Sequence, residues 1–255
     1  MSESKRCAII LFMEIIQQWS ERSIQLLGEE AIERLGRARV AVFGLGGVGS
    51  WCAEALVRSG VGQLLLVDYD CVSPSNINRQ LPAKATTIGE LKTEILSKRF
   101  KELGCGVKLE TIAEKYQVGE GDRFLKGDFD FVVDAIDDLP AKVDIALYCA
   151  KRGLSLITCG GCGRRLDPGQ LKITDLMKSE YDPLLKRMRQ QLRPYRIKGL
   201  PVLYSTEPVL PLPEGQSNPS SMIFVPASAG LRIAAEVCQR IIGLKENPPL
   251  QGDFN

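Results

Sequence analysis

The chain has 255 residues, of which 44% are hydrophobic and 25% charged, and its formal net charge is +2. These values are ordinary for a soluble globular protein, and the small net charge does not require a nucleic-acid partner, although a local basic patch would be compatible with one. The chain contains no histidine, which excludes Ser-His-Asp and Cys-His catalysis, histidine general bases and histidine metal ligands. Chemistry must therefore use carboxylates, lysine, arginine, cysteine, hydroxyls, backbone amides or a bound ion.

The cysteine content and the N-terminal segment bear on where the protein works. A chain of 255 residues is too long for a small disulfide scaffold, so its eight cysteines indicate reduced thiols in a cytoplasmic protein. The apolar run at 8–13 is too short to span a bilayer, and no small-residue cleavage site follows it. We therefore expect no membrane contact, and we expect residues 1–12 to be an upstream extension with Met13 as the natural start.

Helical and strand patterns alternate along the first part of the chain. Helices are predicted at 13–37 (two amphipathic patterns), 48–59, 90–103 and 141–151, and strands at 39–43, 63–67, 108–112, 129–133 and 154–158. Gly60 and Gly153 stand where helices are expected to end. Short apolar strands that alternate with helices predict an α/β fold of the Rossmann type, with a mostly parallel sheet and helices on both faces.

After Gly163 the pattern changes to a C-terminal α/β extension. The segment 164–197 is basic and partly helical, and the proline-rich segment 200–219 predicts an irregular loop. A last strand is predicted at 221–225 and a last helix at 227–242, and we expect the tail after Gly243 to be frayed.

A glycine-rich turn follows the first predicted strand. Its glycines fit G-x-G-x-x-G in a strand–turn–helix context, where such a turn lets phosphates approach the backbone and a helix N-terminus. They are Gly44, Gly46, Gly47 and Gly49. Asp68 ends the second strand, 24 residues after Gly44, at a position where an acidic residue commonly binds ribose hydroxyls. The turn alone does not distinguish NAD, FAD, an adenosylated donor and ATP.

The segment beyond Asp68 favours a nucleoside triphosphate over NAD. It contains Ser75, Asn76, Arg79 and Gln80, a polar set that a dehydrogenase does not need. Arg79 can clamp a phosphate with two parallel hydrogen bonds. Lys92 follows at the start of the next predicted helix and suits the β- or γ-phosphate, although a solvated helix lysine is the alternative for this residue alone.

Carboxylates follow the strand at 129–133. Because the carboxyl ends of parallel strands face the ligand crevice, we expect Asp137 and Asp138 to lie beside the nucleotide. Mg²⁺ typically takes one or two carboxylates together with phosphate oxygens, and we assign it to Asp137. Aspartates that only cap the loop are the alternative.

The sequence carries five spaced elements: the glycine turn, Asp68, the polar segment at 75–80, Lys92 and the carboxylates at 137–138. Together they resemble the adenylating family of the ubiquitin-activating enzymes and the bacterial sulfur-carrier activators ThiF and MoeB. The resemblance covers residues 20–162 and implies ATP and Mg²⁺ as cofactors. It also implies ribose binding by Asp68, phosphate and ribose contacts by Asn76 and Arg79, phosphate neutralisation by Lys92, and magnesium binding by Asp137.

The family resemblance further implies a homodimer. Members use an arginine near the N-terminus that reaches the partner subunit's ATP across the interface, and Arg22 occupies that place. The resemblance divides the chain into an N-terminal extension (1–19), a nucleotide-binding adenylation domain (20–162), a C-terminal extension that contacts substrate or tRNA (163–243) and a tail (244–255).

The cysteine positions narrow the choice among branches of the family. No cysteine lies between Cys162 and Cys238, so a thioester in that stretch is excluded, and a single Cys-x-x-Cys pair makes a four-sulfur zinc site improbable. Cys159 and Cys162 are either a redox pair or, as we favour, small residues in a glycine-rich strand end beside the nucleotide.

Segments after Cys162 are similar to the tRNA-modifying branch, whose members dehydrate threonylcarbamoyladenosine. They lie at 163–168, 173–176, 182–184, 202–207 and 224–230. The resemblance implies ATP-dependent cyclisation of that nucleoside in tRNA through an acyl adenylate. It also allows a cysteine desulfurase or sulfur acceptor as partner, although the cysteine that many relatives carry near Asp182 is missing here.

A basic run in the extension suits a tRNA backbone, with a solvated helix face as the alternative. Its residues are Lys186, Arg187, Arg189, Arg193, Arg196 and Lys198, with Arg164 and Arg165 expected to join the patch. Two other functions stay open: adenylation of a ubiquitin-like sulfur carrier, and a nucleotide-binding regulator without catalysis, such as an NAD sensor.

Overall fold

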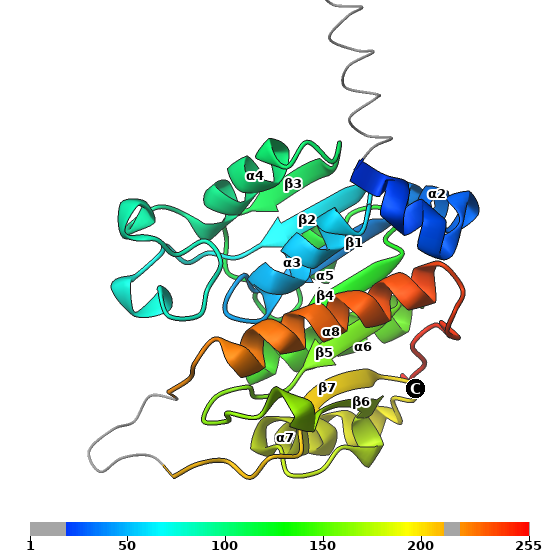
Figure 1. Cartoon of the computed structure of the whole chain (residues 1–255). Coiled ribbons are helices and arrows are strands. Elements are labelled where there is room, and N and C mark those ends of the chain that lie inside the picture. The colour runs from blue at the N-terminus through cyan, green and yellow to red at the C-terminus, as the bar shows by residue number, and fades with distance from the viewer. Residues whose placement is uncertain (1–18, 212–219, 255) are drawn as a thin grey trace, which may run out of the picture.

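The computed structural model describes residues 19–211 and 220–254, which are built around one mixed sheet (Figure 1). Its strands are β1 (Arg39–Phe43), β2 (Gln63–Val67), β3 (Lys108–Ile112), β4 (Phe131–Asp134), β5 (Leu156–Cys159), β6 (Leu171–Asp175) and β7 (Pro201–Ser205). The strand order is β3-β2-β1-β4-β5-β7-β6, with every neighbouring pair parallel except β6 and β7. This arrangement confirms the predicted Rossmann-type α/β fold with a mostly parallel sheet.

Helices cover both faces of this sheet. They are α2 (Glu29–Arg37), α3 (Gly49–Arg58), α4 (Lys92–Glu102), α5 (Gly121–Phe124), α6 (Leu139–Arg152), α7 (Pro183–Leu192) and α8 (Phe224–Ile241), and residues 19–27 are also helical. None of the helices in the described ranges is long and apolar enough to cross a membrane.

The sheet has an apolar core on each face, because successive side chains of a strand point to opposite faces. In β1, Val40 and Val42 face the core that α3, α4 and α8 cover, whereas Ala41 and Phe43 face the core that α6 and α7 cover. Figure 1 shows α8 lying across the sheet beside α3. The two helices cross closely at Gly230, where an added Cβ would lie 2.3 Å from the carbonyl oxygen of Val48.

Three predicted strands, at 39–43, 63–67 and 108–112, have the predicted bounds, and the other helices and strands predicted between 48 and 158 differ by one or two residues at their ends. The edge strand β3 is mostly exposed and carries the charged Lys108 and Glu110. Such charges discourage pairing with another chain. Residues 1–12, Met13 and the loop residues 212–219 lie outside the described residues.

The prediction of an irregular loop over 200–219 is wrong at its beginning. Residues 201–205 form β7, which is fully buried and pairs with both β5 and β6. Proline misled the prediction: Pro201 is the first residue of the strand, a position where its missing N–H is tolerated. The sheet therefore continues past residue 163, and the C-terminal extension shares the core of the nucleotide-binding domain.

Two further predictions at the C-terminus are wrong. No strand forms at 221–225, because α8 begins at Phe224 and holds Pro226 in its first turn, where a helix needs no N–H donor. The tail is not frayed over its described residues: Leu250 is buried, and the backbone of Gln251 pairs with that of Lys198.

Candidate active site

A cavity of about 690 Å³ opens at the carboxyl ends of β1, β2, β4 and β5. Ligands of doubly wound sheets bind at this edge, and a volume of this size suits a nucleotide. Of the predicted site residues, the cavity wall includes Gly44, Gly46, Gly47, Asp68, Arg79, Gln80, Lys92, Asp137 and Asp138. Most residues predicted from separate stretches of the sequence are therefore brought together in one place.

Two glycines of the turn leave no room for a side chain. Gly44 has φ +83°, and a Cβ there would lie 2.8 Å from the carbonyl oxygen of Ala135 at the end of β4. A Cβ on Gly49 would lie 1.8 Å from the carbonyl oxygen of Gly44. Gly49 does not line the cavity; instead it lets α3 begin directly beneath the turn, so that the helix N-terminus faces the cavity.

Asp68 joins the second strand to the glycine turn. One carboxylate oxygen accepts a hydrogen bond from the backbone N–H of Leu45 at 2.6 Å, and the other accepts from the backbone N–H of Asp70 at 2.8 Å. Burial raises the pKa of Asp68 above its usual range, although the nearby Lys92 ammonium opposes this shift. Asp68 therefore holds the shape of the turn besides lining the cavity.

Lys92 is buried, which excludes the solvated helix lysine that the sequence left open. Its side chain is 4% exposed, and its Nζ lies 2.8 Å from Oδ2 of Asp70 and 3.9 Å from Oδ2 of Asp68. A buried ammonium is stable only when carboxylates accompany it. The pair of aspartates thus keeps a positive charge in the cavity wall, at the first residue of α4.

Arg79 lies at the cavity edge with part of its guanidinium already engaged. Its Nη1 donates to the backbone oxygen of Ser75 at 2.8 Å and to Oδ1 of Asn78 at 2.9 Å. The neighbouring Gln80 is buried, and its Oε1 accepts no hydrogen bond from any residue in the described ranges. This oxygen has almost no accessible surface, so a ligand would reach it only if the Gln80 side chain turned toward the cavity.

Ser75 and Asn76 lie in the same loop but outside the cavity wall. Oδ1 of Asn76 accepts the backbone N–H of Ser73 at 3.1 Å, and the hydroxyl of Ser75 lies 2.9 Å from that of Ser73. In this structure both residues shape the loop that carries Arg79. Their predicted contacts with the nucleotide remain predictions.

The two aspartates after β4 have different surroundings. Asp138 caps α6 by accepting the N–H of Ala141 at 3.1 Å, and it pairs with Lys115 at 3.5 Å. Asp137 lines the cavity, is exposed, and has no hydrogen-bond or ion-pair partner in the part of the chain that the structure describes. Its free carboxylate fits a Mg²⁺ ion that takes its other ligands from phosphates and water.

Two side chains of the cavity, one aromatic and one basic, were not predicted from the sequence. Tyr69 is half exposed, and the ammonium of Lys115 lies 5.8 Å from its ring centroid. Tyr69 follows the predicted ribose carboxylate directly, which is a usable signal. Lys115 comes from the segment after the edge strand β3, and nothing in its local sequence marks it.

A fully buried ion pair beneath the cavity was also missed. Asp134 ends β4, and its Oδ2 accepts from Nζ of Lys142 at 2.9 Å and from Oγ1 of Thr158 at 2.7 Å. Asp134, Lys142 and Thr158 have no exposed surface. The group ties α6 and the ends of β4 and β5 together, and thus fixes the strand ends from which the cavity loops start.

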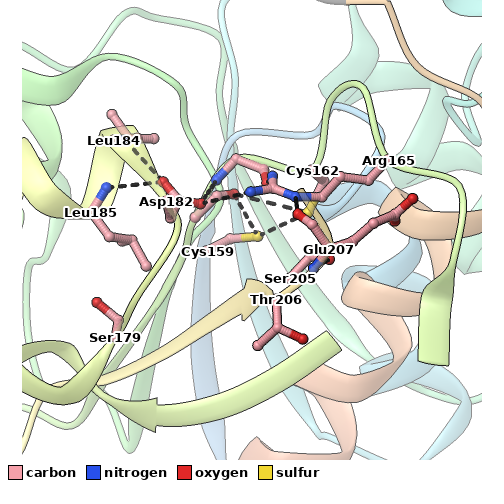
Figure 2. A network of polar contacts seen from close by, with 12 residues as sticks. Cys159, Cys162, Arg165, Ser179, Asp182, Leu184, Leu185, Ser205, Thr206 and Glu207 are labelled. Atoms are coloured by element: carbon pink, nitrogen blue, oxygen red, sulfur yellow. Dashed lines mark hydrogen bonds and ion pairs between the residues drawn. The ribbon is translucent and has the colours of Figure 1, made fainter. Parts of the chain in front are cut away.

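The Cys-x-x-Cys segment begins at the end of β5 and forms part of the cavity wall, and Figure 2 shows its two cysteines. Cys159 and Cys162 are both buried and both line the cavity. This placement agrees with the predicted position of the pair beside the nucleotide, and it does not by itself decide between the packing and the redox interpretations.

The predicted basic patch needs correction at Arg165. Arg165 is buried and donates to the backbone oxygens of Gly161 and Glu207, so it cannot contribute to a surface patch. Arg189 is half buried and donates to the backbone oxygen of Ser179, and Arg164 donates to that of Leu210. The remaining basic residues of the run are exposed: Lys186, Arg187, Arg193, Arg196 and Lys198.

Arg22 is exposed on the helical segment 19–27 and is not part of the cavity wall. An interface position is compatible with this exposure, and the role across a dimer remains a prediction.

The fold and the cavity define a Rossmann-type nucleotide-binding protein, whose cavity wall carries Lys92, Arg79 and Asp137. The ThiF family model matches residues 20–251, and the chain belongs to the ThiF family.

Named relatives cover most of the chain. It is 38% identical over 208 residues to tRNA threonylcarbamoyladenosine dehydratase of Haemophilus influenzae, covering 78% of this chain and 80% of the relative. It is 34% identical to the enzyme of that name from Bacillus subtilis, covering 89% and 96%. The solved structure of Escherichia coli tRNA N6-threonylcarbamoyladenosine dehydratase in complex with ATP superposes with a TM-score of 0.84 at 29% identity, covering 89% and 95%.

Proposed function

We propose that this chain is an ATP-dependent tRNA threonylcarbamoyladenosine dehydratase. The observation that carries the proposal is the cavity itself, where the glycine turn, the buried Lys92 ammonium, Arg79 and the exposed Asp137 carboxylate line one nucleotide-sized space. Similarity to the named dehydratases over most of the chain supports this assignment, as does the ATP in the Escherichia coli structure.

The proposed reaction has two steps. In the first step the carboxylate of the threonyl group attacks the α-phosphate of ATP. The bond between the α- and β-phosphates breaks, pyrophosphate departs, and an acyl adenylate is formed. The carbamoyl nitrogen of the same modified base then attacks the acyl carbon, the ring closes and AMP leaves. An internal nucleophile held close to its target needs no enzyme cysteine, in agreement with the absence of cysteine between Cys162 and Cys238.

The chain's own groups neutralise the charge that develops on the leaving pyrophosphate. Lys92 and Arg79 both line the cavity, and preorganised cations stabilise a phosphoryl-transfer transition state. Asp137 would hold a Mg²⁺ ion, which would supply positive charge to offset that of the phosphates. Asp68 would accept the ribose hydroxyls while it holds the turn through Leu45.

The exposed basic residues on and after α7 form a surface that suits the tRNA backbone. Lys186 and Arg187 lie on α7, and Arg193, Arg196 and Lys198 follow it. Leu184, at the beginning of the same helix, lines the nucleotide cavity. A tRNA held on this surface would therefore lie next to the site where its modified base reacts.

The assembly and location complete the proposal. We propose a cytoplasmic homodimer in which Arg22 reaches the partner's ATP, and a sulfur-transferring partner stays open. Mixed dimers of Arg22→Ala and Lys92→Met subunits test the interface: recovery of activity supports action across it, and no recovery contradicts it.

Mass spectrometry of tRNA nucleosides tests the reaction. Incubation of threonylcarbamoyladenosine-containing tRNA with the protein and ATP should convert the nucleoside to a product lighter by one water, with release of pyrophosphate and AMP. An ATP analogue with a methylene bridge between the α- and β-phosphates serves as the matched control and should give no product. Pyrophosphate exchange driven by a ubiquitin-like carrier, with unchanged tRNA, would instead select the sulfur-carrier activator. NAD binding without ATP binding would select a regulator.

A further inference from the structure

Two thiols lie side by side in the wall of the nucleotide cavity. Cys159 is the last residue of β5, and its Sγ lies 3.7 Å from Sγ of Cys162 (Figure 2). Both side chains line the cavity although they are otherwise buried. The cavity is therefore the route by which a small reagent reaches them. The proposed adenylation uses neither thiol.

The turn between the two cysteines is held rigidly. The N–H of Gly161 donates to Oδ2 of Asp182 at 2.8 Å, and the guanidinium of Arg165 donates to the carbonyl oxygen of Gly161. A Cβ on Gly160 would lie 2.6 Å from the same Asp182 oxygen. Figure 2 shows this turn enclosed between Asp182 and Arg165, with the two sulfur atoms toward each other. A small residue is needed at 160, but packing alone does not require two sulfur atoms in contact.

The thiol of Cys159 is held in its protonated form. The hydrogen bond to Cys162, together with burial, raises the pKa of Cys159 well above its usual range. Cys159 therefore keeps its proton and can donate it toward Cys162. Cys162 is the other sulfur of this contact and lines the cavity, where an oxidant would meet it.

We propose that Cys159 and Cys162 form a peroxide-sensitive thiol pair, and that its disulfide reshapes the nucleotide cavity. The proposal rests on the proposed function only in identifying the cavity's ligand as ATP. The oxidant class is hydrogen peroxide, which is small enough to enter a nucleotide cavity.

The oxidation proceeds in two balanced steps. The sulfur of Cys162 attacks one oxygen of hydrogen peroxide, the O–O bond breaks, and the leaving hydroxide takes the proton of the Cys162 thiol to become water. The resulting sulfenic acid is then attacked by the sulfur of Cys159. The S–O bond breaks, and the hydroxide leaves as water with the proton from Cys159. Two thiols thus give up two electrons, and one peroxide becomes two waters.

The disulfide must change the cavity wall. A disulfide joins its sulfur atoms at about 2.05 Å, well below the 3.7 Å between them in the reduced pair. Closing this gap draws the turn toward the end of β5 and away from its contacts with Asp182 and Arg165. We therefore expect oxidised protein to bind ATP about tenfold more weakly, and we expect bound ATP to shield the pair.

Peptide mass spectrometry of the full chain tests the pair. Trypsin is expected to release residues 153–164, which contain Cys159 and Cys162 as their only cysteines. After peroxide treatment and alkylation of free thiols, this peptide should be unalkylated and lighter by two hydrogens, and a dithiol reductant should reverse the change. Alkylation of the exposed Cys71 in the same sample calibrates the peroxide dose.

Variants and ligand separate the proposal from simpler outcomes. Cys162→Ala and Cys159→Ala should each abolish the two-hydrogen loss, whereas Cys105→Ala, at a half-buried thiol outside the cavity wall, should leave it intact. In wild type, peroxide should weaken ATP binding about tenfold and dithiol should restore it; in Cys162→Ala, peroxide should leave the affinity of that variant unchanged.

Some results of these experiments would contradict the thiol pair or its coupling to ATP binding. Two alkylated cysteines, or only sulfinic and sulfonic acids, at a dose that oxidises Cys71 would overturn the thiol pair. A disulfide that forms equally fast with and without ATP, or that leaves ATP affinity unchanged, would overturn its coupling to the cavity. Neither readout uses tRNA, so failure of the dehydratase assay and failure of this proposal are distinguishable.

Discussion

The ammonium of Lys92 lies 2.8 Å from the carboxylate of Asp70, inside a cavity wall where its side chain is only 4% exposed. The sequence alone allowed a solvated lysine at this position. The ion pair shows instead a cation held ready in the site, because a buried ammonium without a function would carry a desolvation cost for no gain in packing.

Replacing Lys92 should therefore impair catalysis much more than folding. We expect Lys92→Met to lower the rate of pyrophosphate release about 100-fold or more, because one preorganised charge at the leaving group is removed. Lys98→Met, at an exposed position of the same helix, is the matched control and should keep its rate. Equal rates of pyrophosphate release in the two variants would show that Lys92 has no role in the reaction.

Replacing Asp137 and replacing Asp138 should have different effects, the first on magnesium dependence and the second on stability. Asp137→Ala should weaken the Mg²⁺ dependence of ATP binding and leave the melting temperature unchanged, because its carboxylate has no partner within the described ranges. Asp138→Ala should lower the free energy of unfolding by about 1 kcal/mol, because it removes the cap of α6. Magnesium titrations and denaturant unfolding of both variants check the pair, and the reverse pattern would contradict the assignment.

Breaking the buried ion pair under the cavity should destabilise the whole fold. Lys142→Met leaves the Asp134 carboxylate buried without its ammonium, and we expect a loss of about 3–5 kcal/mol in the free energy of unfolding. The double variant Lys142→Met with Asp134→Leu should recover part of that loss. Urea unfolding of the two proteins gives the answer, and a double variant no more stable than the single one would show that the charge is not the cause.

Stability should fall in acid through Glu54. Burial alone would raise the pKa of Glu54, but hydrogen bonds from Arg99 and Arg58 outweigh it and hold that pKa below its usual range. A depressed carboxyl pKa contributes stability that is present above the unfolded pKa and lost as the pH falls through the folded value. Glu54→Gln should therefore lower the urea midpoint near pH 7, and the difference from wild type should shrink below about pH 4. A difference that is the same at both pH values would exclude this linkage.

Charge reversal on α7 should weaken tRNA binding selectively. Lys186→Glu combined with Arg187→Glu should reduce tRNA affinity, and the slope of log affinity against log salt should become shallower by roughly one for each phosphate that no longer meets a cation. ATP affinity should not change. Lys98→Glu with Lys101→Glu on α4, at the opposite edge of the sheet in Figure 1, is the control of equal charge and should bind tRNA normally. Equally weakened binding in both proteins would argue for non-specific attraction.

Local patterns predicted the parts of the fold that depend on neighbours in sequence. The strands β1 and β2 have the predicted bounds because each is a short apolar run with a glycine next to one end, and β3 follows the glycines at 104 and 106. The strand β7 was missed because a proline-rich segment is typical of a loop, and only its burial between β5 and β6 reveals a strand.

Site residues that belong to a local sequence motif could be predicted. Contacts between residues from distant segments of the chain could not. The glycine turn, Asp68 and Asp137 are marked by their positions at strand ends. The burial of Lys92, the Asp134–Lys142 pair and the enclosure of Arg165 depend on contacts between separate elements. The sequence also predicted too many residues for the basic surface patch. Arg165 and Arg189 donate to backbone oxygens within the protein, whereas other basic residues of the run are exposed to solvent.

The place of α8 has a consequence for the order in which the protein can form. This helix is the last one along the described chain, yet its first turn brings Pro226 to the cavity wall, where a Cβ on Gly47 would lie 3.2 Å from the proline's own Cβ. A nascent chain on the ribosome cannot close the cavity until α8 has emerged. Nucleotide binding thus becomes available only after synthesis has passed residue 241.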